Sequence, residues 1–387
     1  MHVAINLLSA GSGGAINYAR SLTPLLNATI EARGGKLTVI AYDGLLSTSS
    51  LGQNGIHDLV VFPRRSGLAR VAWERVHLRN VLKNINPDIV FFPHQIGPKI
   101  EEVPVVMMIR NMEPFFFNAY PSPLKKKIRN YVLREASKRS CRRASHVVCV
   151  SKYVHAYAAK ELGIDGAYTS VIYHGRDPRF SPNQAVTDKA VLSKYQLDEA
   201  GFLLTCGSLL PYRRCEDIVR SFLENVSPQF PGLKLIVSGA VLDRHYFEKI
   251  CSPQHAPNKK VHFVGHVSPD DLAALYRHCK LFITATEIEA CPNIAIEALA
   301  SGCKIVSAMT QPLMEIFGAA AAYYPRRSVL ELSNTITTLL SNTERHDEMA
   351  QIALARSQDF SWEKCAQETY EMLVSVCNSP NQYALRQ

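Results

Sequence analysis

The sequence lacks the apolar runs that membrane-spanning segments need. Its first such run, residues 3–5, is interrupted by Asn6, and no later run reaches the roughly 18 apolar residues of a transmembrane helix. No secretory signal or low-complexity tract is evident. The ten cysteines stand singly and never as Cys-x-x-Cys, which argues against disulfides and a zinc site. These absences indicate a globular protein of the cytoplasm with buried thiols.

What the sequence does contain is a repeated alternation of short β-branched runs with segments of 3.6-residue periodicity. This pattern is typical of parallel sheets covered by helices. A chain of 387 residues with 47% apolar residues can build two such domains. Strands are expected at residues 2–8, 36–42, 88–92, 103–109, 146–150, 170–173, 202–206, 233–238, 261–264, 281–284 and 304–307.

A polar stretch without periodicity, residues 178–199, divides this alternation and is interpreted as a linker. We therefore predict an α/β protein with two Rossmann-like, doubly wound domains, residues 1–177 and 200–358, facing across a cleft. Ligands are expected at the carboxyl ends of the strands. A last segment, residues 359–387, carries a helix that follows the second sheet.

Two loops resemble anion sites. Gly13 and Gly14 follow the first strand and precede a helix, so they can bring backbone amides close to a phosphate. A tight structural turn is the plain alternative, and an NAD site is disfavoured because Ile16 replaces the third glycine of the fingerprint. In the second domain, the first strand is followed by Gly207, Ser208, Arg213 and Arg214, a set suited to phosphate binding or to a solvated helix start.

The segment from Glu289 to Glu297 places two carboxylates eight residues apart around Pro292. On one continuous helix they would differ by about 80° in direction, so they do not share a face. Proline favours the first turn of a helix, which puts Glu289 in a loop and Glu297 inside the helix. Amides at the helix start then suit a diphosphate, while the carboxylates can accept hydrogen bonds from sugar hydroxyls.

The sequence from 289 to 302, Glu-Ala-Cys-Pro-Asn-Ile-Ala-Ile-Glu-Ala-Leu-Ala-Ser-Gly, resembles the glutamate-x7-glutamate signature of retaining glycosyltransferases of family 4. Residues 264–276, residues 171–177 and the Phe-Ser-Trp362 segment agree with the family's order. The resemblance implies the two-domain GT-B fold, with the C-terminal helix returning to the N-terminal domain. It also implies a nucleotide-sugar donor, UDP- or GDP-linked, and no other cofactor.

The resemblance further implies roles for single residues. Glu289 would lie beside the donor sugar and Glu297 would hold the ribose. Arg213 replaces the usual phosphate-binding lysine, whereas Ser208 replaces an arginine. The donor-binding residues implied in this way are Gly13, Gly14, Gly207, Ser208, Arg213, Arg214, Cys291, Pro292, Asn293, Ile294 and Glu297.

One departure from the family concerns a histidine that many relatives carry after the strand 103–109. Here Arg110 and Asn111 stand at that place, and we expect one of them, with Glu289, to serve catalysis. His94, after the neighbouring strand, is the other candidate, although a lone histidine there is more often structural. No metal site is expected, because Arg213 and the helix start can stabilise the leaving diphosphate.

Residues 124–143 hold nine basic residues and one acid, so this segment carries nearly all of the net charge of +9. Lys125, Lys126, Lys127 and Arg129 begin it, and apolar residues recur among the charges at helical spacing. An anionic membrane surface or an acidic acceptor fits this pattern. A solvated helix face is the plain alternative, and nucleic acid is the least favoured partner.

Taken together, these patterns predict a metal-independent hexosyltransferase acting on a glycan or lipid-linked acceptor in cell-surface polysaccharide or lipopolysaccharide biosynthesis. It would be cytoplasmic, or peripheral on the inner face of the cytoplasmic membrane. A nucleotide-sugar epimerase of the same fold is one alternative. A catalytically silent nucleotide-sugar-binding protein is the other.

Overall fold

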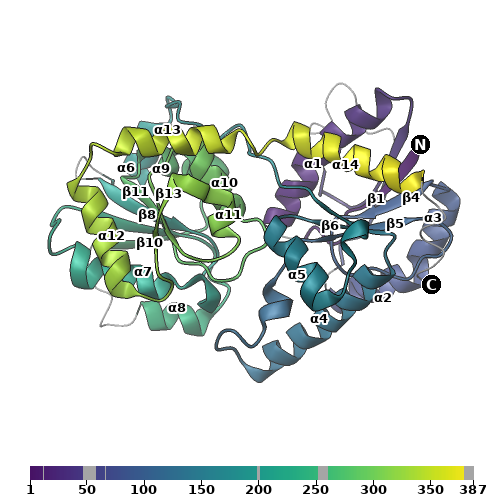
Figure 1. Ribbon diagram of the computed structural model, residues 1–387, viewed down its shortest axis with the longest axis horizontal. Helices are drawn as coiled ribbons and strands as arrows, with labels where there is room; N and C mark the ends of the chain where they lie inside the picture. The colour runs from purple at the N-terminus through teal and green to yellow at the C-terminus, as the bar shows by residue number, and fades with distance from the viewer. Residues whose placement is uncertain (12, 47–57, 66, 198–200, 252–259, 379–387) are drawn as a thin grey trace. The chain divides into compact units, whose positions relative to one another are not determined.

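The computed structural model describes residues 1–11, 13–46, 58–65, 67–197, 201–251 and 260–378. The chain forms two compact units. Unit 1 comprises the described residues of 1–117, 124–175 and 361–378, and unit 2 comprises those of 118–123 and 176–360 (Figure 1). Unit 1 is thus discontinuous in sequence, because its last helix follows the whole of unit 2.

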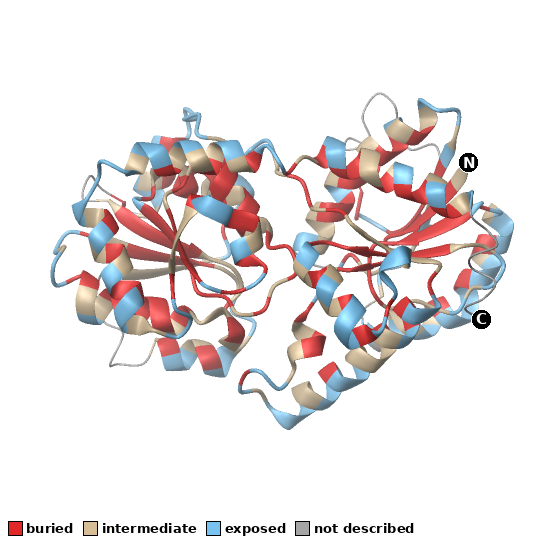
Figure 2. Ribbon diagram, in the orientation of Figure 1, coloured by how far each residue is buried: buried red, intermediate tan, exposed pale blue. Residues whose placement is uncertain are grey.

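In the described part of unit 1, seven parallel strands form one sheet in the order β3-β2-β1-β4-β5-β6-β7. They are β1 (His2–Asn6), β2 (Lys36–Tyr42), β3 (Asp58–Phe62), β4 (Ile89–Phe92), β5 (Val105–Ile109), β6 (His146–Cys149) and β7 (Thr169–Val171). The helical elements are α1 (Gly14–Glu31), α2 (Gly67–Trp73), the π-helical η2 (Glu74–Leu78), α3 (Arg79–Ile85), η3 (Glu113–Phe116), α4 (Leu124–Arg143), α5 (Lys152–Leu162), η4 (Gly166–Tyr168) and α14 (Trp362–Cys377). The central strands are buried along their length (Figure 2).

In the described part of unit 2, six parallel strands follow the order β10-β9-β8-β11-β12-β13. They are β8 (Phe202–Cys206), β9 (Lys234–Ser238), β10 (Val261–Gly265), β11 (Leu281–Thr284), β12 (Ile305–Ala308) and β13 (Ala321–Tyr324). The helical elements are α6 (Asp188–Lys194), η5 (Pro211–Arg213), α7 (Cys215–Ser221), η6 (Phe222–Val226), α8 (Arg244–Ile250), α9 (Pro269–His278), α10 (Asn293–Ala300), α11 (Leu313–Phe317), η7 (Gly318–Ala320), α12 (Val329–Ser341) and α13 (His346–Ser357).

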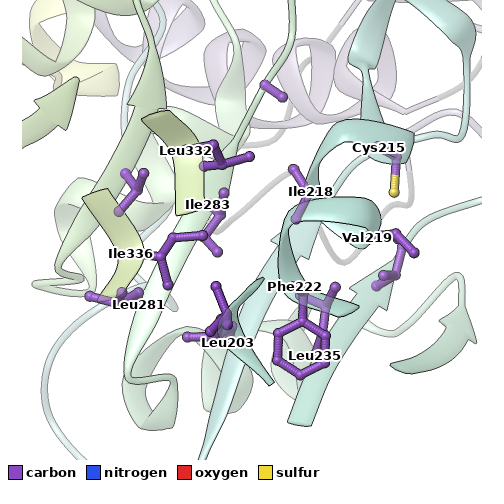
Figure 3. Packing of buried hydrophobic residues seen from close by; sticks show 14 of the residues in the cluster. Leu203, Cys215, Ile218, Val219, Phe222, Leu235, Leu281, Ile283, Leu332 and Ile336 are labelled. Atoms are coloured by element: carbon purple, nitrogen blue, oxygen red, sulfur yellow. The ribbon is translucent and has the colours of Figure 1, made fainter. Parts of the chain in front are cut away.

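The core of unit 2 shows why these segments fold as they do. Leu203 and Ile283 project from β8 and β11 toward Phe222, and Leu332 and Ile336 close the cluster from α12 (Figure 3). Each of these five side chains is almost fully buried. Burying a side chain of this size contributes about 1.5–3 kcal/mol. The apolar residues that recur along these strands and helices thus pack against one another in a single layer between helices and sheet.

Helix α14 completes the core of unit 1. Trp362 packs edge-on against Tyr18 of α1, with ring centroids 5.6 Å apart, and stacks on His174 at 5.9 Å. A Cβ atom at Gly175 would lie 2.2 Å from the backbone nitrogen of Trp362, so only glycine permits this approach. Ser361 caps the helix by accepting a hydrogen bond from the Lys364 amide at 3.1 Å.

Two strands and a helix in the predicted linker are among the elements that were not predicted. Strands β3 and β13 lie at sheet edges, where Asp58 and the sequence Ala-Ala-Tyr-Tyr weaken the β pattern. The stretch predicted as a linker contains α6, which packs on α9 and belongs to unit 2. Asp188 opens α6 and binds Arg277 of α9 through two hydrogen bonds, which explains the order of this polar segment. All ten cysteines are free thiols.

Candidate functional site

Both sheets reverse their strand order at one point, between β1 and β4 in unit 1 and between β8 and β11 in unit 2. Loops that leave two such strands diverge to opposite sides of the sheet, and the crevice between them is where doubly wound folds bind ligands. In unit 2 these are loops 207–214 and 285–292. They contain most of the predicted donor-binding residues.

Gly207 makes room for the guanidinium of Arg213. Its φ is +121°, in the region that favours glycine, and an added Cβ would lie 2.7 Å from Arg213 Nη1. Arg213 Nε and Nη1 are buried, and neither forms an aligned hydrogen bond with a described residue. Buried N–H groups are normally paired. This arginine is therefore prepared for an anionic ligand such as phosphate.

Glu289 lies beside this arginine, with Oε1 2.9 Å from Arg213 Nη1. The two groups form an ion pair, but their geometry is not that of an aligned hydrogen bond. The Arg213 side chain is 21% exposed and the Glu289 side chain 13% exposed. Burial raises the pKa of Glu289, against the lowering influence of Arg213 and of the Thr286 hydroxyl. Burial alone would lower the pKa of Arg213, but Glu289 reverses this and raises it. Arg213 therefore stays cationic.

Helix α10 starts directly after this loop. Pro292 is its N-cap residue, with extended ψ of 118°, so the predicted proline lies just before the first turn rather than in it. Its carbonyl accepts a hydrogen bond from the Ala295 amide at 3.0 Å. The first-turn amides of Asn293 and Ile294 precede the intrahelical hydrogen-bond ladder. Together with Cys291 they place the positive end of the helix dipole at the carboxyl end of β11.

Glu297 lies one turn further along α10. Burial and the charge of Asp177 raise its pKa to about 7, while Tyr276 and Arg179 oppose the rise. The Tyr276 hydroxyl donates to Glu297 Oε2 at 3.4 Å. Arg179 is held by Asp177 through hydrogen bonds of 3.0 Å and 2.5 Å. These three neighbours were not predicted as site residues, although Asp177 ends the segment 171–177, which is one of those that carried the resemblance.

Two other predicted donor residues differ in their surroundings. Arg214 adopts a left-handed φ of +53° and binds both carboxylate oxygens of Asp217 at 2.9 Å, with Glu216 at 3.0 Å. Its guanidinium thus stabilises the start of α7. Ser208 lines a small cavity at the ends of β8 and β11 together with Gly207, Arg213 and Thr286. It supplies a hydroxyl where the family usually has a cation.

In unit 1, the glycine loop precedes α1 as predicted. Gly13 is the N-cap residue with φ of +48°, and an added Cβ would meet no atom within 4 Å. Gly14 begins the helix. Arg64 donates to the Gly11 carbonyl at 2.7 Å and so fixes the loop. The predicted role of these glycines toward a donor remains a prediction.

The loops after β4 and β5 meet at Gln95. Its side chain accepts from the Asn111 amide at 3.1 Å and donates to the Asn111 carbonyl at 2.9 Å. The Asn111 side chain accepts a hydrogen bond at 3.0 Å from the amide of Glu113, the first residue of η3. Arg110 lies over the Tyr18 ring at 5.1 Å. The hydrogen bonds of Asn111 hold the loop in place, so its role is structural. Arg110 is the residue of this loop that brings a charge.

His94 is buried next to this loop. No described residue forms an aligned hydrogen bond with either ring nitrogen. Burial, followed by the charges of Arg70 and Arg110, holds the pKa of His94 well below its usual range, and a backbone group of Ile96 only weakly opposes this. The ring is therefore a neutral imidazole. Phe92 packs edge-on against it at 5.5 Å.

A charged network at the end of β1 was missed by the sequence analysis. Asn6 donates to Glu74 Oε1 at 3.1 Å, and Arg70 donates to Glu74 Oε2 at 2.6 Å. Glu74 is almost fully buried, and burial raises its pKa against the influence of Arg70. It starts the π-helical turn η2, and such turns occur often at functional sites. The polar Asn6 within an apolar strand was the available signal.

The predicted basic helix forms as α4. Its exposed residues include Lys125, Leu124, Ile128 and Val132, the last three being 71%, 55% and 56% exposed. Lys126 is drawn inward to Glu113 at 3.1 Å. Lys127 and Arg129 complete the first turns of the helix.

Among the described residues, no helix is both long and apolar enough to cross a membrane. Nor does this part of the chain gather three or more metal-ligating side chains into a group that could hold an ion.

Comparisons with known proteins agree with this architecture. The family model described as "Glycosyltransferase Family 4" matches residues 12–180, and that of "Glycosyl transferases group 1" matches residues 192–356. "Serotype-specific mannosyltransferase WbdA" of Escherichia coli is 23% identical over 197 residues, which are 49% of this chain and 24% of that protein. The chain thus matches about a quarter of the length of this relative.

Solved structures share the fold over nearly the whole chain. Anabaena Alr3699/HepE in complex with UDP and glucose aligns with a TM-score of 0.72 and 19% identity, covering 96% of this chain and 99% of that one. WaaG, a glycosyltransferase involved in lipopolysaccharide biosynthesis, aligns with a TM-score of 0.69 and 15% identity, covering 95% and 98%. The predicted fold class of two Rossmann-like domains is confirmed.

Proposed function

The chain belongs to glycosyltransferase family 4, and we propose that it transfers a hexose from a UDP- or GDP-sugar, with retention, to a glycan or lipid-linked acceptor. The observation that carries this proposal is the buried Arg213 beside Glu289, at the start of α10. Cleavage of the donor builds negative charge on the β-phosphate and positive charge at the anomeric carbon. Arg213 and the α10 amides stabilise the first, and Glu289 stabilises the second.

The remaining residues take supporting roles in this proposal. Glu297, with its hydroxyl neighbour Tyr276, accepts hydrogen bonds from the ribose. The neutral ring of His94 and the charge of Arg110 lie at the carboxyl ends of β4 and β5, where we place the acceptor. Because Arg213 supplies the positive charge that the leaving group needs, we propose transfer without a metal. EDTA should leave the rate unchanged.

A panel of UDP- and GDP-sugars, scored by thermal shift and by donor hydrolysis, tests the activity. Glu289→Gln should lower turnover by about 100-fold or more, as expected for a group that acts on charge in the transition state, while the donor still raises the melting temperature. Epimerisation of the donor without an acceptor would contradict the proposal. Binding without turnover in the wild type would indicate a catalytically silent protein.

A matched pair of variants tests the phosphate contact. Arg213→Gln should abolish the thermal shift caused by the donor, because it removes the buried guanidinium whose N–H groups form no aligned hydrogen bond with a described residue. Arg214→Gln should lower the melting temperature itself and keep the donor-induced shift, since Arg214 binds Asp217 and Glu216. Equal effects of the two substitutions on donor binding would contradict the assignment.

We also propose that α4 attaches the enzyme to the inner face of the cytoplasmic membrane. Leu124, Ile128 and Val132 are exposed on the same helix as Lys125 and Arg129, a combination that favours an anionic lipid surface. Lys125→Gln with Arg129→Gln should reduce co-sedimentation with anionic vesicles. The charge-matched pair Lys83→Gln and Lys160→Gln, on α3 and α5, should not. Binding that is indifferent to lipid charge would refute attachment through α4.

A further inference from the structure

Unit 1 contains a groove of about 670 Å³ that is separate from the donor-site loops of unit 2. It runs between α2 and η2 on one side, α4 on another, and the loop after β4. Its apolar lining consists of Val71, Ile96, Gly97, Pro98, Tyr131, Val132 and Ala136. Its charged and polar lining consists of Arg75, Lys99, Glu135, Arg139, Ser140 and Arg143.

The charge of this groove is positive and partly unpaired. Arg75, Arg139 and Arg143 are exposed, and none of them forms an ion pair with an acid among the described residues. Lys99 is paired with Glu101, and Glu135, the acid in the lining, lies 3.9 Å from Arg134. Arg143 Nε donates a hydrogen bond to the Arg139 carbonyl at 3.2 Å, which leaves the guanidinium groups of Arg75 and Arg139 for a ligand. Three arginines in one groove favour a phosphate-bearing ligand over a neutral one.

The apolar lining of the groove indicates which kind of molecule accompanies the phosphate. Tyr131 and Val132 are 51% and 56% exposed, although they project from a helix that is otherwise rich in charge. Val71 and Ile96 stand across from them in the same lining. A free inorganic anion gains nothing from such a wall, whereas an alkyl or isoprenoid chain is stabilised by about 25 cal/mol for each Å² it buries. The lining therefore fits a molecule with an anionic head and an apolar chain.

The position of the groove connects it to the proposed acceptor side. Ile96 and Gly97 follow His94 and Gln95 directly, so one loop lines the groove and also holds the sheet end of β4. We propose that this groove binds the acceptor as a phosphate-bearing lipid, with Arg75 and Arg139 on the phosphate and the apolar lining along the chain. This inference rests on the proposed glycosyl transfer and names the class of its acceptor.

Calorimetric titration of the full chain with dodecyl phosphate, below its micelle concentration, tests this site. We expect saturable binding that is at least about tenfold weaker in Arg75→Gln with Arg139→Gln, since this variant loses the charge-assisted hydrogen bonds to the phosphate. The pair Lys125→Gln and Arg129→Gln removes the same charge from α4 outside the groove. It should keep dodecyl phosphate binding while it loses vesicle binding.

Two comparison ligands and one more variant separate the two halves of the site. Inorganic phosphate and dodecyl maltoside, which carry only the anion or only the chain, should each bind at least about tenfold more weakly than dodecyl phosphate. Val132→Asn should weaken dodecyl phosphate binding severalfold. Equal losses in both charge variants, or equal binding of inorganic phosphate, would overturn the proposal.

The proposed transfer and the groove can fail independently. Donor-induced thermal shift and donor hydrolysis report on the loops of unit 2 and do not require the groove. Intact donor hydrolysis without saturable amphiphile binding would overturn the groove alone. Loss of both donor binding and hydrolysis in the wild type would instead overturn the proposed function.

Discussion

The carboxylate of Glu297 has a pKa of about 7 because it is buried near Asp177, compared with an ordinary value of 4.5. In the unfolded chain this group ionises above pH 4.5, whereas in the folded chain it keeps its proton until about pH 7. Between these values the folded state binds more protons, so stability falls as pH rises. Above pH 7, where Glu297 is ionised in the folded chain, its burial lowers the free energy of unfolding by up to about 3 kcal/mol.

Glu297→Gln should therefore stabilise the fold at pH 8 by about 1–3 kcal/mol and leave it nearly unchanged at pH 4.5. Urea unfolding at both pH values measures the difference. The same substitution should weaken donor binding, because glutamine is a poorer acceptor for ribose hydroxyls. A gain in stability that is the same at both pH values would show that Glu297 does not carry the perturbed titration.

Among single residues, those that belong to a motif with a fixed spacing could be predicted from the sequence. Glu289, Glu297 and Arg213 were expected near one another, and the structure places Arg213 against Glu289. The partners of Glu297 could not be anticipated, because Asp177 and Arg179 come from a segment that reads as the end of one domain. Arg214 has the same charge as Arg213, and only the left-handed backbone shows that it turns toward Asp217.

Among the elements, the turn between β8 and η5 sets the position of Arg213. Gly207→Ala should disturb it, because the added Cβ would lie 2.7 Å from Arg213 Nη1 and the φ of +121° is strained for alanine. We expect about 1–3 kcal/mol lower stability and at least about tenfold weaker donor binding.

Gly265→Ala is the matched control for this turn. Gly265 has a φ of +68°, and an added Cβ would meet nothing within 4 Å. It should cost about 1 kcal/mol in backbone strain and leave donor affinity unchanged. If both alanine variants bind the donor equally well, the close approach of Gly207 to Arg213 has no role in binding.

Strands could be predicted from the sequence where both faces of the sheet are buried, because such strands are continuous apolar runs. Strands β8 and β11 have the predicted bounds, as does helix α5. The edge strands β3 and β13 escaped detection since they carry only part of that pattern. Helix α6 was missed because it is stabilised by Arg277 of α9, a contact that no local propensity reveals.

For the whole molecule, unit 1 depends on a helix that is distant in sequence. Trp362→Ala should destabilise unit 1 by about 3–5 kcal/mol, the usual cost of a large cavity. Trp362 is only 4% exposed and packs on Tyr18, His174 and Gly175. The chain has two tryptophans, and the other, Trp73, also lies in unit 1. Fluorescence of Trp73 therefore reports on unit 1 in this variant.

Urea unfolding followed by Trp73 fluorescence should shift to lower denaturant in Trp362→Ala. Far-UV circular dichroism should retain a later transition from unit 2, which contains no tryptophan. A common shift of both signals would mean that the two units unfold as one. The matched control is Leu332→Ala in the core of unit 2, which should shift only the later transition.

Because α14 follows unit 2 in the sequence, unit 1 cannot complete its fold until α14 has been synthesised. Residues 1–175 leave the ribosome well before Trp362, and at about 5–20 residues per second the interval is on the order of ten to forty seconds. Until then Tyr18 on α1 lacks the ring that covers it. Unit 2, whose residues all precede 361, can complete its core first. The nascent chain thus reverses the usual N-to-C order of folding, and chaperones would meet the open face of α1 in that interval.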